Sequence, residues 1–476
     1  MLEVTLSLNP DSTQPLYIQI FEYIKHEMIQ GKISAGTRLP SIRQLSEHLR
    51  VSRNTIETAY QQLIMEGYVE SRPRSGLYVV DVNQDDVKLP GKSGYDQSPI
   101  DKSESQLEEE TENIRIDFRY GNVDAEHFPF HTWRKLTLEA LHPNHKRLFI
   151  YGNPQGEQDL RFDIAKYLRH SRGVNCTAEQ VVIGSGIQSL LNLLSLMIKA
   201  EGRIIAMENP GYDGARRVFE AQGLAVAPIS LDKQGLNVKE LYHSMANTVY
   251  ITPSHQFPCG MTMPVARRMA LLNWAYDQNG LIIEDDYDGE FRYNGRPIPA
   301  LQGLDQHQHV VYVGSFSKSL LPSLRISYMI LPPTLIERYR ETFLGYDTPV
   351  SYLHQKTLQL FMSHGHWERH LRRMRKVYRS KQTVLLDALS EYLGTLEIDI
   401  LGQDAGLHIL LRVRNGLSEK ELVDRASRHQ VKVYPISHHW ADPLQAHLNV
   451  VQLGFGGLTE DEIIEGVQSL AQAWKT

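Results

Sequence analysis

Apolar residues in the first eighty positions recur at helical spacing and then at strand spacing. The first helical face consists of residues four positions apart, namely Leu16, Ile20, Ile24 and Met28. A second helix is predicted to begin at a capping box formed by Ser41 and Gln44, and a third after the N-cap Ser52. Two short strands follow over residues 68–71 and 77–80, joined by a turn. Two helices, a tight turn, a third helix and a hairpin predict a winged helix-turn-helix.

Beyond residue 116, apolar runs of strand length alternate with helical stretches. The predicted strands cover residues 181–184, 203–207, 248–252, 281–285, 310–314 and 326–331. Because these runs are continuously apolar, they predict a mostly parallel α/β sheet with both faces covered, divided into a large and a small subdomain. The most apolar run, 181–198, contains Gln188 and Asn192, so we interpret it as strand, turn and buried helix rather than a membrane span.

Charge is distributed unevenly along the 476 residues, whose net charge of −6 argues by itself against a nucleic-acid partner. Residues 1–80 hold eight basic and eight acidic groups, whereas residues 81–113 hold ten acidic groups and three lysines. The second segment is rich in Ser, Pro, Gly and Gln, which predicts a flexible tether; a surface excursion of one domain is the alternative. We therefore divide the chain into a domain at 1–80, an acidic linker at 81–113 and a domain at 114–476.

The cysteine and histidine residues bear on the cellular compartment of the protein and on whether it binds a metal. Cys176 and Cys259 are too few for a disulfide framework, which suits a reducing compartment. No apolar stretch follows a basic start, so no secretory signal is expected, and the expected location is cytoplasmic. The histidine pairs at 307/309, 364/366 and 438/439 have no third ligand at useful spacing, and no metal site is predicted.

Basic and polar residues stand where a winged helix would contact DNA. Arg53, Asn54 and Thr55 occupy the first turn of the third predicted helix, where side chains reach base edges in the major groove. Arg72 and Arg74 lie in the hairpin turn, where a wing would contact phosphates. On the residues alone, a small helical domain with solvated arginines is the alternative.

The same region resembles the GntR family of bacterial transcription regulators. The resemblance is carried by residues 39–79, LPSIRQLSEHLRVSRNTIETAYQQLIMEGYVESRPRSGLYV. It implies DNA contacts from the second helix, the third helix and the wing, and it implies a bacterial protein that lies on the nucleoid when bound to promoter DNA. The candidate DNA-contacting residues are Ser41, Arg43, Arg53, Asn54, Thr55, Arg72, Arg74 and Gly76.

Chemically distinctive residues follow several predicted strands, at the carboxyl edge where sheets of this class bind ligands. A glycine-rich turn at 184–188 ends one strand and opens a helix, which offers backbone amides and a positive helix end to a phosphate. A carboxylate and a phenol follow another strand on the same face, and a lysine with two serines follows a third. The residues concerned are Ser185, Gly186, Ile187, Asp285, Tyr287, Ser315, Ser317, Lys318 and Arg325.

This combination matches the chemical needs of pyridoxal 5′-phosphate. Lys318 would form an imine with the cofactor, Asp285 would make a charge-assisted hydrogen bond to the pyridine nitrogen, and Tyr287 would hold the phenolate oxygen. Ser315 and Arg325 would join the glycine-rich turn around the phosphate. Desolvation and nearby positive charge would lower the pKa of the lysine, as imine exchange requires.

Residues 114–476 resemble the fold-type I aminotransferases, and the whole chain resembles the MocR subfamily of GntR regulators. The stretches TPSHQFPCG (252–260), IIEDDYDGEF (282–291) and SFSKSLLPSLRISYM (315–329) are similar to its GABA-responsive member. The resemblance implies that Tyr212 packs against the cofactor ring and that the protein forms a head-to-tail homodimer.

The sequence departs from the family pattern at positions that bind ligands. Phe257 stands where many aminotransferases have an asparagine. In an approximate alignment, Gly214 and His438 replace the two arginines with which GABA-responsive members hold the ligand carboxylate, and a neutral histidine cannot form the bidentate fork of arginine. GABA is therefore disfavoured as the effector. The candidate effector contacts are His255, Arg216 and His438.

We expect a transcription regulator that senses an amino compound by external aldimine formation at Lys318 and thereby alters promoter binding. Candidate effectors are amino acids, dipeptides and pyridoxal phosphate itself. The alternative is an active aminotransferase with a DNA-binding appendage, because turnover needs the same lysine, aspartate and tyrosine. The predicted DNA-binding domain favours the sensing function, because formation of the aldimine could then change how the protein binds to DNA.

Overall fold

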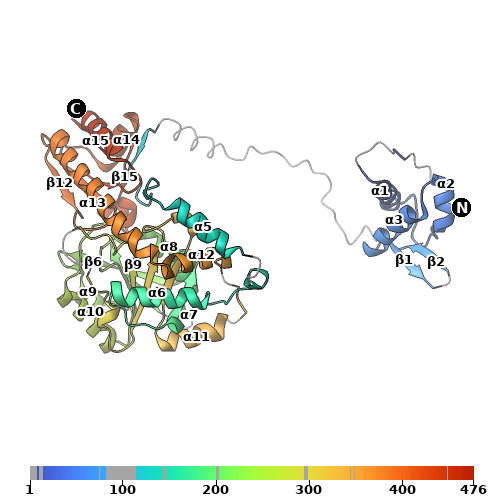
Figure 1. Cartoon of the computed structure of the whole chain (residues 1–476), viewed down its shortest axis with the longest axis horizontal. Coiled ribbons are helices and arrows are strands. Elements are labelled where there is room, and N and C mark those ends of the chain that lie inside the picture. The colour runs from blue at the N-terminus through green and yellow to red at the C-terminus, as the bar shows by residue number, and fades with distance from the viewer. Residues whose placement is uncertain are drawn as a thin grey trace. The chain divides into compact units, whose positions relative to one another are not determined.

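The computed structural model describes residues 8–9, 14–73, 75–81, 114–142, 146–199, 203–293, 298–343, 345–347, 349–446 and 449–475. The chain divides into two compact units, Met1–Glu104 and Ser105–Thr476 (Figure 1). The predicted linker lies outside the described residues except for Asp81, and so does Arg74. The domain boundaries at 80 and 113 therefore stay predictions. No helix within the described ranges is long and apolar enough to span a membrane.

Three helices and a hairpin form the N-terminal unit. They are α1 (Leu16–Ile29), α2 (Ile42–Leu49), α3 (Arg53–Met65), β1 (Val69–Arg72) and β2 (Gly76–Val79). Ser41 caps α2 through the predicted capping box with Gln44, and the Ser52 hydroxyl oxygen accepts a 3.1 Å hydrogen bond from the Thr55 N–H. The buried residues of α3 are the four that its apolar spacing indicates: Ile56, Ala59, Tyr60 and Leu63. The predicted winged helix-turn-helix is confirmed.

An eight-stranded sheet lies at the centre of the second unit, in the order β4-β11-β10-β9-β8-β5-β6-β7. The strands are β4 (Val181–Gly184), β5 (Ile204–Asn209), β6 (Ala225–Asp232), β7 (Gly235–Leu236), β8 (Thr248–Ile251), β9 (Leu281–Asp286), β10 (Val310–Ser315) and β11 (Ser327–Ile330). Neighbours from β10 through β6 are parallel, whereas β11 runs antiparallel to both β10 and β4. The mostly parallel sheet is confirmed, with β6 as an additional strand, in which Ile229 is buried and the other residues are exposed or half-buried.

Both faces of this sheet are buried, as the continuous apolar strands predict. Ile183 packs into a core with α6 (Gln158–Ser171) and α12 (Tyr352–Ser363), while its neighbour Val182 packs into a second core with α7 (Ile187–Lys199) and α11 (Pro333–Phe343). Adjacent residues of a strand point to opposite faces, so helices must cover both. These helices are α5 (Phe130–Ala140), α6 (Gln158–Ser171), α7 (Ile187–Lys199), α8 (Asp213–Ala221), α9 (Val238–His243), α10 (Val265–Asp277), α11 (Pro333–Phe343) and α12 (Tyr352–Ser363).

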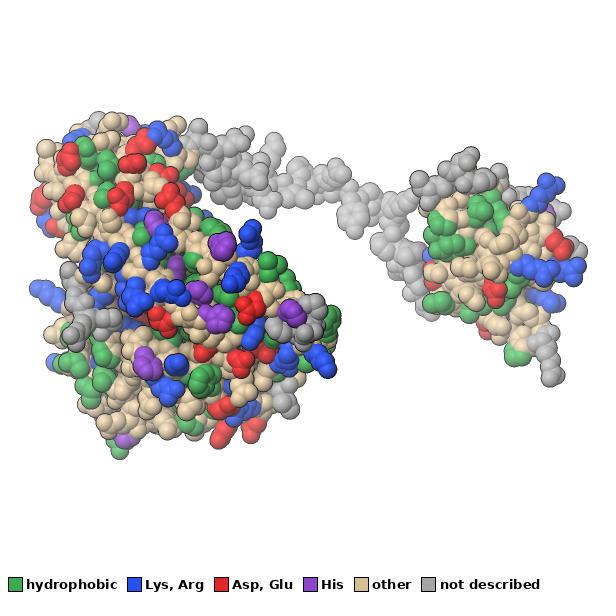
Figure 2. Space-filling view, in the orientation of Figure 1, with side chains coloured by type: hydrophobic (Ala, Val, Ile, Leu, Met, Phe, Trp, Pro, Cys, Tyr) green, Lys and Arg blue, Asp and Glu red, His purple; other side chains and the backbone are tan. Residues whose placement is uncertain are grey.

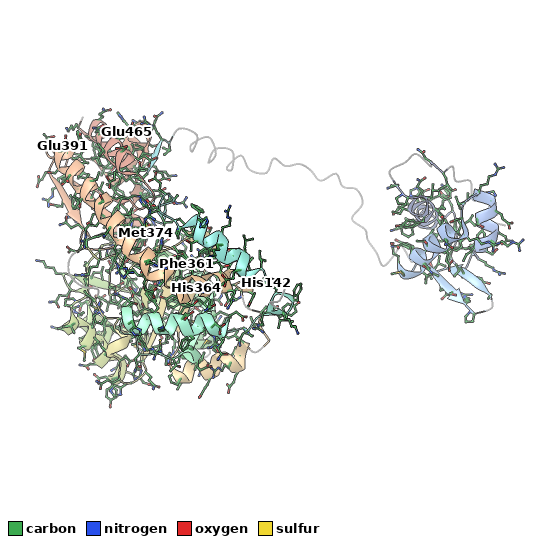
Figure 3. All side chains as sticks on the ribbon, in the orientation of Figure 1. His142, Phe361, His364, Met374, Glu391 and Glu465 are labelled. Atoms are coloured by element: carbon green, nitrogen blue, oxygen red, sulfur yellow. The ribbon has the colours of Figure 1, made fainter. Side chains whose placement is uncertain are left out.

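A second, antiparallel sheet forms the small subdomain, in the order β12-β13-β16-β15. Its elements are β12 (Ile398–Leu401), β13 (His408–Val413), α14 (Glu419–Arg428), β15 (Tyr434–Pro435), β16 (Val450–Gly454) and α15 (Glu460–Trp474). The long helix α13 (His366–Leu393) runs from the large subdomain into this one, with the buried Met374 along its length and Glu391 near its far end (Figure 3). The short strand β3 (Ile116–Asp117) pairs with β14 (Val431–Lys432), which ties the start of the second unit to the small subdomain.

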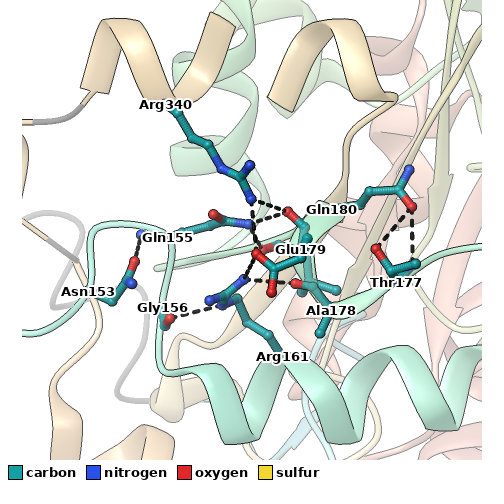
Figure 4. Close-up of polar contacts among 10 residues, drawn as sticks. Asn153, Gln155, Gly156, Arg161, Thr177, Ala178, Glu179, Gln180 and Arg340 are labelled. Atoms are coloured by element: carbon teal, nitrogen blue, oxygen red, sulfur yellow. Dashed lines mark hydrogen bonds and ion pairs between the residues drawn. The ribbon is translucent and has the colours of Figure 1, made fainter. Parts of the chain in front are cut away.

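Polar contacts hold the segment before α6 against β4, the strand that leads to the glycine-rich turn (Figure 4). The Gln155 side chain donates to the carbonyls of Glu179 and Val181 at 2.7 and 2.8 Å. The Ile183 N–H donates to the Gln155 carbonyl at 3.0 Å, and Arg340 of α11 pairs with the Glu179 carboxylate at 3.0 Å. Buried polar groups are thereby paired, and the strand is fixed where it delivers the turn.

Candidate functional site

A cavity of about 440 Å³ lies at the carboxyl ends of β9 and β10. Eight of the ten predicted cofactor-binding residues line it, namely Ile187, Tyr212, Asp285, Tyr287, Ser315, Ser317, Lys318 and Arg325. The other two, Ser185 and Gly186, form the turn between β4 and α7, next to Ile187. The cavity lining also includes Arg119, Tyr120, Gly121, Gln188, Thr252, Phe257 and Pro322. Residues far apart in sequence converge because parallel strands end at the same edge of the sheet.

Lys318 enters the cavity three residues beyond the end of β10. Its Nζ lies 3.7 Å from the centroid of the Tyr120 ring, in a cation–π contact. Burial lowers the pKa of Lys318 from 10.5 to about 8; the Asp288 carboxylate opposes this change, and the positive charge of Arg119 adds to it. The amine is therefore partly neutral near pH 8, and the neutral form is the nucleophile that imine chemistry requires.

Asp285 is a buried carboxylate that no described cation pairs with. Its side chain accepts a hydrogen bond from the Tyr250 hydroxyl, and the residue is 5% exposed. Burial raises the pKa of Asp285 to about 7; the bond from Tyr250 lowers it, and the carboxylates of Asp286 and Asp288 raise it further. An unpaired buried carboxylate is costly, and a protonated pyridine nitrogen in the cavity would supply the missing positive partner.

The wall formed by the β4–α7 turn fits a phosphate group. Gly186 has φ of +96°, and a Cβ at this position would overlap the Arg325 guanidinium, which therefore packs directly against the glycine. Helix α7 begins at Ile187, so its positive end faces this wall. The hydroxyls of Ser315 and Ser317 lie 2.9 Å apart on the neighbouring wall. The guanidinium, the helix end and the hydroxyls are suitable phosphate ligands.

Tyr287 is held in place by the buried His255. The Tyr287 hydroxyl donates to the His255 carbonyl at 2.8 Å and lies 3.0 Å from His255 Nδ1. The same nitrogen lies 3.0 Å from a carboxylate oxygen of Asp288. His255 is 2% exposed and is absent from the cavity lining, so in this structure it positions Tyr287. A direct effector contact from His255 stays a prediction.

Aromatic rings form the side of the cavity where many aminotransferases present an asparagine. The Phe257 ring meets Tyr212 and Tyr287 edge-on, at centroid distances of 5.8 and 5.9 Å. A Cβ on Gly214 would lie 2.5 Å from the Tyr212 ring, so the missing side chain makes room for this tyrosine. An arginine at position 214 is thus incompatible with the observed place of the Tyr212 ring.

The other two predicted effector contacts lie outside the cavity lining. The Arg216 guanidinium donates to the carbonyls of Trp440 and His439 at 2.8 and 2.7 Å, so it supports the short helix η5 (Ser437–His439). His438 is exposed. Asp213, His438 and His439 bring potential metal-ligating atoms within 4.8 Å of one another, a grouping that the sequence spacing does not indicate. The roles of Arg216 and His438 and the absence of a metal site stay predictions.

Sequence patterns do not predict the segment Arg119–Gly121, which passes over Lys318. The Gly454 N–H donates to the Phe118 carbonyl at 2.8 Å and joins the segment to the end of β16. A Cβ on Gly121 would lie 3.2 Å from Lys318 Nζ, so the backbone approaches the amine closely. The segment lies almost two hundred residues before Lys318. The pairing of β3 with β14 and the bond from Gly454 bring it there.

The predicted base-reading residues are exposed at the start of α3. Arg53 and Asn54 are exposed, and neither side chain forms a hydrogen bond or ion pair with another described residue. The Thr55 hydroxyl takes part in the N-cap of α3. On α2, Arg43 pairs with Glu47 at 3.0 Å, and basic side chains gather on the side of this unit that carries α2 (Figure 2). These side chains are available to a polyanion.

The wing presents a glycine against an arginine that the sequence patterns do not single out. Gly76 has φ of +119°, and a Cβ there would lie 2.9 Å from Arg38 Nε. Arg72 lies 4.5 Å from the centroid of the Tyr78 ring and pairs with Glu70. Arg38 and Arg72 thus both lie beside the hairpin.

Comparisons with known proteins identify a family for each of the two units. Residues 16–79 match the family described as bacterial regulatory proteins, gntR family, and residues 114–443 match aminotransferase class I and II. The chain is 44% identical to the uncharacterized HTH-type transcriptional regulator YdeL of Bacillus subtilis, over 100% of both chains. It is 35% identical to the probable rhizopine catabolism regulatory protein MocR of Rhizobium meliloti, over 98% of this chain and 96% of that protein.

Among solved structures, a kynurenine aminotransferase of Pyrococcus horikoshii in complex with PMP has a TM-score of 0.69 and 27% identity, over 78% of this chain and 93% of that one. The aminotransferase fold therefore covers the second unit, while the regulatory relatives extend over both units. The chain belongs to the MocR-type regulators of the GntR family, in which a GntR DNA-binding domain precedes an aminotransferase class I and II domain.

Proposed function

We propose that this regulator uses pyridoxal 5′-phosphate at Lys318 to sense an amino compound and alters its binding to promoter DNA in response. GntR-family regulators bind DNA, and the second domain has the fold of aminotransferases. The proposal joins the two: the DNA-binding domain reads the promoter, and the cavity reads the amine. The protein acts in the bacterial cytoplasm, where it binds DNA of the nucleoid.

The observation that carries the cofactor assignment is the unpaired, buried Asp285 in the same cavity as Lys318. Bound there, pyridoxal 5′-phosphate supplies an electrophilic carbonyl carbon and an electron-withdrawing ring. Asp285 would hold the ring nitrogen, Tyr287 would hold the phenolate oxygen once its hydroxyl proton turns from the His255 carbonyl, and the wall of Arg325 and Gly186 would hold the phosphate. Each of these side chains has a contact that holds it in place: Asp285 accepts a hydrogen bond from Tyr250, Tyr287 donates to the His255 carbonyl, and Arg325 packs against Gly186.

The sensing step is an exchange of amines at one carbon atom. With pyridoxal 5′-phosphate held at Lys318, the cofactor would supply an imine carbon at which the effector amine could replace Lys318 as an external aldimine, and Lys318 would be released as an amine that carries the displaced proton. No oxidant or reductant is consumed. The freed Lys318 and the bound effector then contact different cavity walls, so the binding energy of the effector can favour one arrangement of the protein over another.

Turnover as an aminotransferase is the second candidate, favoured by the pKa of Lys318, about 8, which suits a proton-transferring base. Adding amines to the cofactor-loaded protein and recording both the cofactor spectrum and the keto products separates the two functions. A stable spectral shift without keto product is the result expected for sensing. Repeated cycling to the pyridoxamine form with release of keto product would establish the enzyme instead.

We also propose that the regulator acts as a head-to-tail homodimer. Large apolar side chains are exposed on α5 and around the short helix η1 (Lys146–Phe149), and α12 packs against both elements. They are Phe130, Leu138, Leu141, Phe149, Ile150 and Tyr151, with Phe149 81% and Tyr151 84% exposed. Such clusters mark protein interfaces. Light scattering should give the mass of a dimer for the natural chain, and a monomeric mass at working concentration would reject this proposal.

A further inference from the structure

Asp213, His438 and His439 form a cluster of side chains where the large subdomain meets the small one. Asp213 begins α8 of the large subdomain, whereas the two histidines belong to η5, between β15 and β16 of the small subdomain. Their potential ligand atoms lie within 4.8 Å of one another. Asp213 precedes the histidines by more than two hundred residues, so sequence spacing predicts no metal site here, and only the fold brings the three side chains together.

The contact between Asp213 and His439 has the separation of two ligands on one ion. Asp213 Oδ1 and His439 Nδ1 lie 3.3 Å apart. Two atoms bound at about 2.1 Å to a tetrahedral Zn²⁺ lie about 3.4 Å from each other. His439 is 3% exposed, and its Nδ1 is a buried nitrogen without a hydrogen-bond partner among the described residues. This nitrogen therefore lacks the partner that buried polar atoms normally have.

His438 adds a third ligand and an opening to solvent. Its ring lies against that of His439, with the ring centroids 3.8 Å apart. Because His438 is exposed, a hydrated ion can reach the cluster, and a water molecule can complete a tetrahedral set of ligands. Two imidazoles this close repel each other when both are protonated, whereas one ion bound by both brings a single centre of positive charge.

The surroundings of Asp213 keep its carboxylate ionised and oriented. Burial raises the pKa of Asp213, but the neighbouring His439 and His438 lower it by more, so the pKa lies below its ordinary value. The Arg217 guanidinium pairs with Oδ2 at 3.4 Å and leaves Oδ1 beside His439. Carboxylates that bind metal ions are themselves commonly held by a further partner in this way.

Backbone contacts hold η5 against the start of α8. The Gly211 N–H donates to the His439 carbonyl at 3.0 Å, and the Arg216 guanidinium donates to the same carbonyl at 2.7 Å. The Ala441 N–H donates to the Asn209 side chain at 2.8 Å. The side chains of the cluster are thus placed before an ion arrives, which reduces the entropy lost on binding.

Two other groups of described residues bring potential ligand atoms equally close, but they are poorly suited to an ion. They are His255, Asp288 and His408, and Asp124, Glu126 and His127. All residues of the first group are buried, and His255 Nδ1 already contacts Asp288 and the Tyr287 hydroxyl, so a hydrated ion has no path to it. In the second group, an ion would have to displace Lys381, whose Nζ lies 2.6 Å from the Asp124 carboxylate.

We propose that Asp213, His438 and His439 bind a divalent transition-metal ion such as Zn²⁺, which joins the two subdomains beside the cavity. Imidazole and carboxylate ligands suit Zn²⁺, whereas Mg²⁺ prefers oxygen ligands alone. Tyr212, which precedes Asp213, lines the cavity, and the Phe257 ring of the cavity lining meets His439 edge-on at 4.8 Å. The bound ion therefore restrains the wall that these two rings form. The site does not depend on the function proposed for Lys318.

Calorimetric titration of the full-length, cofactor-loaded protein with Zn²⁺ tests this proposal. We expect one tight site per chain, with which excess Mg²⁺ does not compete. His438→Gln and Asp213→Asn each change one ligand, in different subdomains, and each should weaken Zn²⁺ binding by about tenfold or more, since loss of even an outer partner of a metal ligand costs about 10- to 100-fold. His429→Gln, an exposed histidine at the end of α14, is the matched control and should bind like the natural protein.

The outcomes either support the site or reject it. Absence of a tight site for Zn²⁺ in the natural protein would reject it outright. Equal Zn²⁺ affinity in His438→Gln and the natural protein would place the ion elsewhere, even if Asp213→Asn binds more weakly. Because His438 is exposed, its replacement should leave the protein folded, and circular dichroism verifies this for each variant. None of these results changes the assignment of Lys318, since no amine takes part in the titration.

Discussion

The DNA-binding unit and the cavity hold their charged residues in opposite environments. Arg53 is exposed at a helix start, whereas Lys318 and Asp285 are enclosed at strand ends. Salt screens exposed charges, so each one contributes little, and binding to DNA depends on how many phosphate contacts are made. In the cavity, burial brings the pKa of Lys318 down to about 8 and that of Asp285 up to about 7. Charged side chains thus make many weak contacts to a polyanion in the DNA-binding unit. In the cavity of the second unit, burial turns a few of them into reactive groups.

Replacing Lys318 by alanine should have the largest effect, because it removes the only nucleophile assigned to the cofactor. We expect complete loss of the imine absorption band and of every spectral response to amines. Promoter binding by the N-terminal unit should persist, since its contacts are exposed and independent of the cavity. Lys166→Ala, on α6, is a matched control that should keep the band. An imine band that survives in Lys318→Ala would show that another lysine carries the cofactor.

The pH dependence of cofactor loading sharpens the contrast with exposed lysines. Since the neutral amine reacts, and burial lowers the pKa of Lys318 to about 8, loading of the cofactor-free protein should accelerate as the pH rises through about 8 and then level off. An exposed lysine would continue to accelerate to about pH 10.4. Stopped-flow absorbance between these limits distinguishes the two, and a rate that keeps rising beyond pH 9 would contradict the burial of Lys318.

Asp285→Asn should weaken the cofactor without disturbing the shape of the cavity. The amide keeps the side-chain volume but loses the charge-assisted bond to the ring nitrogen, so we expect affinity for pyridoxal 5′-phosphate to fall by about 10- to 100-fold. Fluorescence titration of the cofactor-free protein measures this change. Asp163→Asn, a half-buried carboxylate on α6, provides the control. Equal cofactor affinity in Asp285→Asn and the natural protein would remove Asp285 from the site.

In the DNA-binding unit, single changes should be smaller. Arg53→Ala should cost about 1–3 kcal/mol of specific binding if its side chain reads a base. Arg72→Ala should weaken binding to all sequences alike and reduce the salt dependence by about one ion. Gel-shift titrations at two salt concentrations, on the target promoter and on random DNA, measure both. Equal losses on both DNAs for Arg53→Ala would move Arg53 from base reading to phosphate contact.

Ser52→Ala tests the local structure that presents these residues. The Ser52 hydroxyl oxygen accepts the Thr55 N–H at the start of α3, and its loss should lower the free energy of unfolding of this unit by about 1 kcal/mol. Ser75→Ala, in the hairpin turn, is the comparison variant. Urea unfolding followed by circular dichroism gives both values. If Ser52→Ala unfolds at the same urea concentration as the natural chain, the cap contributes nothing to α3.

Helices, strands and helix caps of both units were predictable, because apolar periodicity and capping residues depend only on residues close together in the sequence. The buried face of α3 and the strands β8 and β9 follow directly from apolar spacing. Strand β6 is not among the predicted strands. Its apolar run at 225–229 contains Pro228, which disfavours a strand, and only Ile229 in it is buried. Residue types at strand ends predicted that Lys318 and Asp285 lie close together, and both line one cavity, because parallel strands end at the same edge of the sheet.

Contacts between distant segments account for what the sequence did not predict. Arg119 and Tyr120 reach the cavity because β3 pairs with β14, more than three hundred residues later, and because the Gly454 N–H donates to the Phe118 carbonyl. Arg216 was a candidate for the effector by its charge, yet its guanidinium meets carbonyls of η5, which no local pattern reveals. Gly214 is small because the Tyr212 ring folds over it. Such pairings depend on tertiary packing.

In the function proposed for this protein, an amine bound at Lys318 controls promoter binding. The most direct measurement follows promoter occupancy and the cofactor spectrum together while amines and amino acids are added, one at a time, to the full-length protein. We predict that both change with the same midpoint, that no keto acid accumulates, and that Lys318→Ala changes in neither signal. Occupancy that stays constant while the cofactor cycles and keto acid is released would contradict the claim.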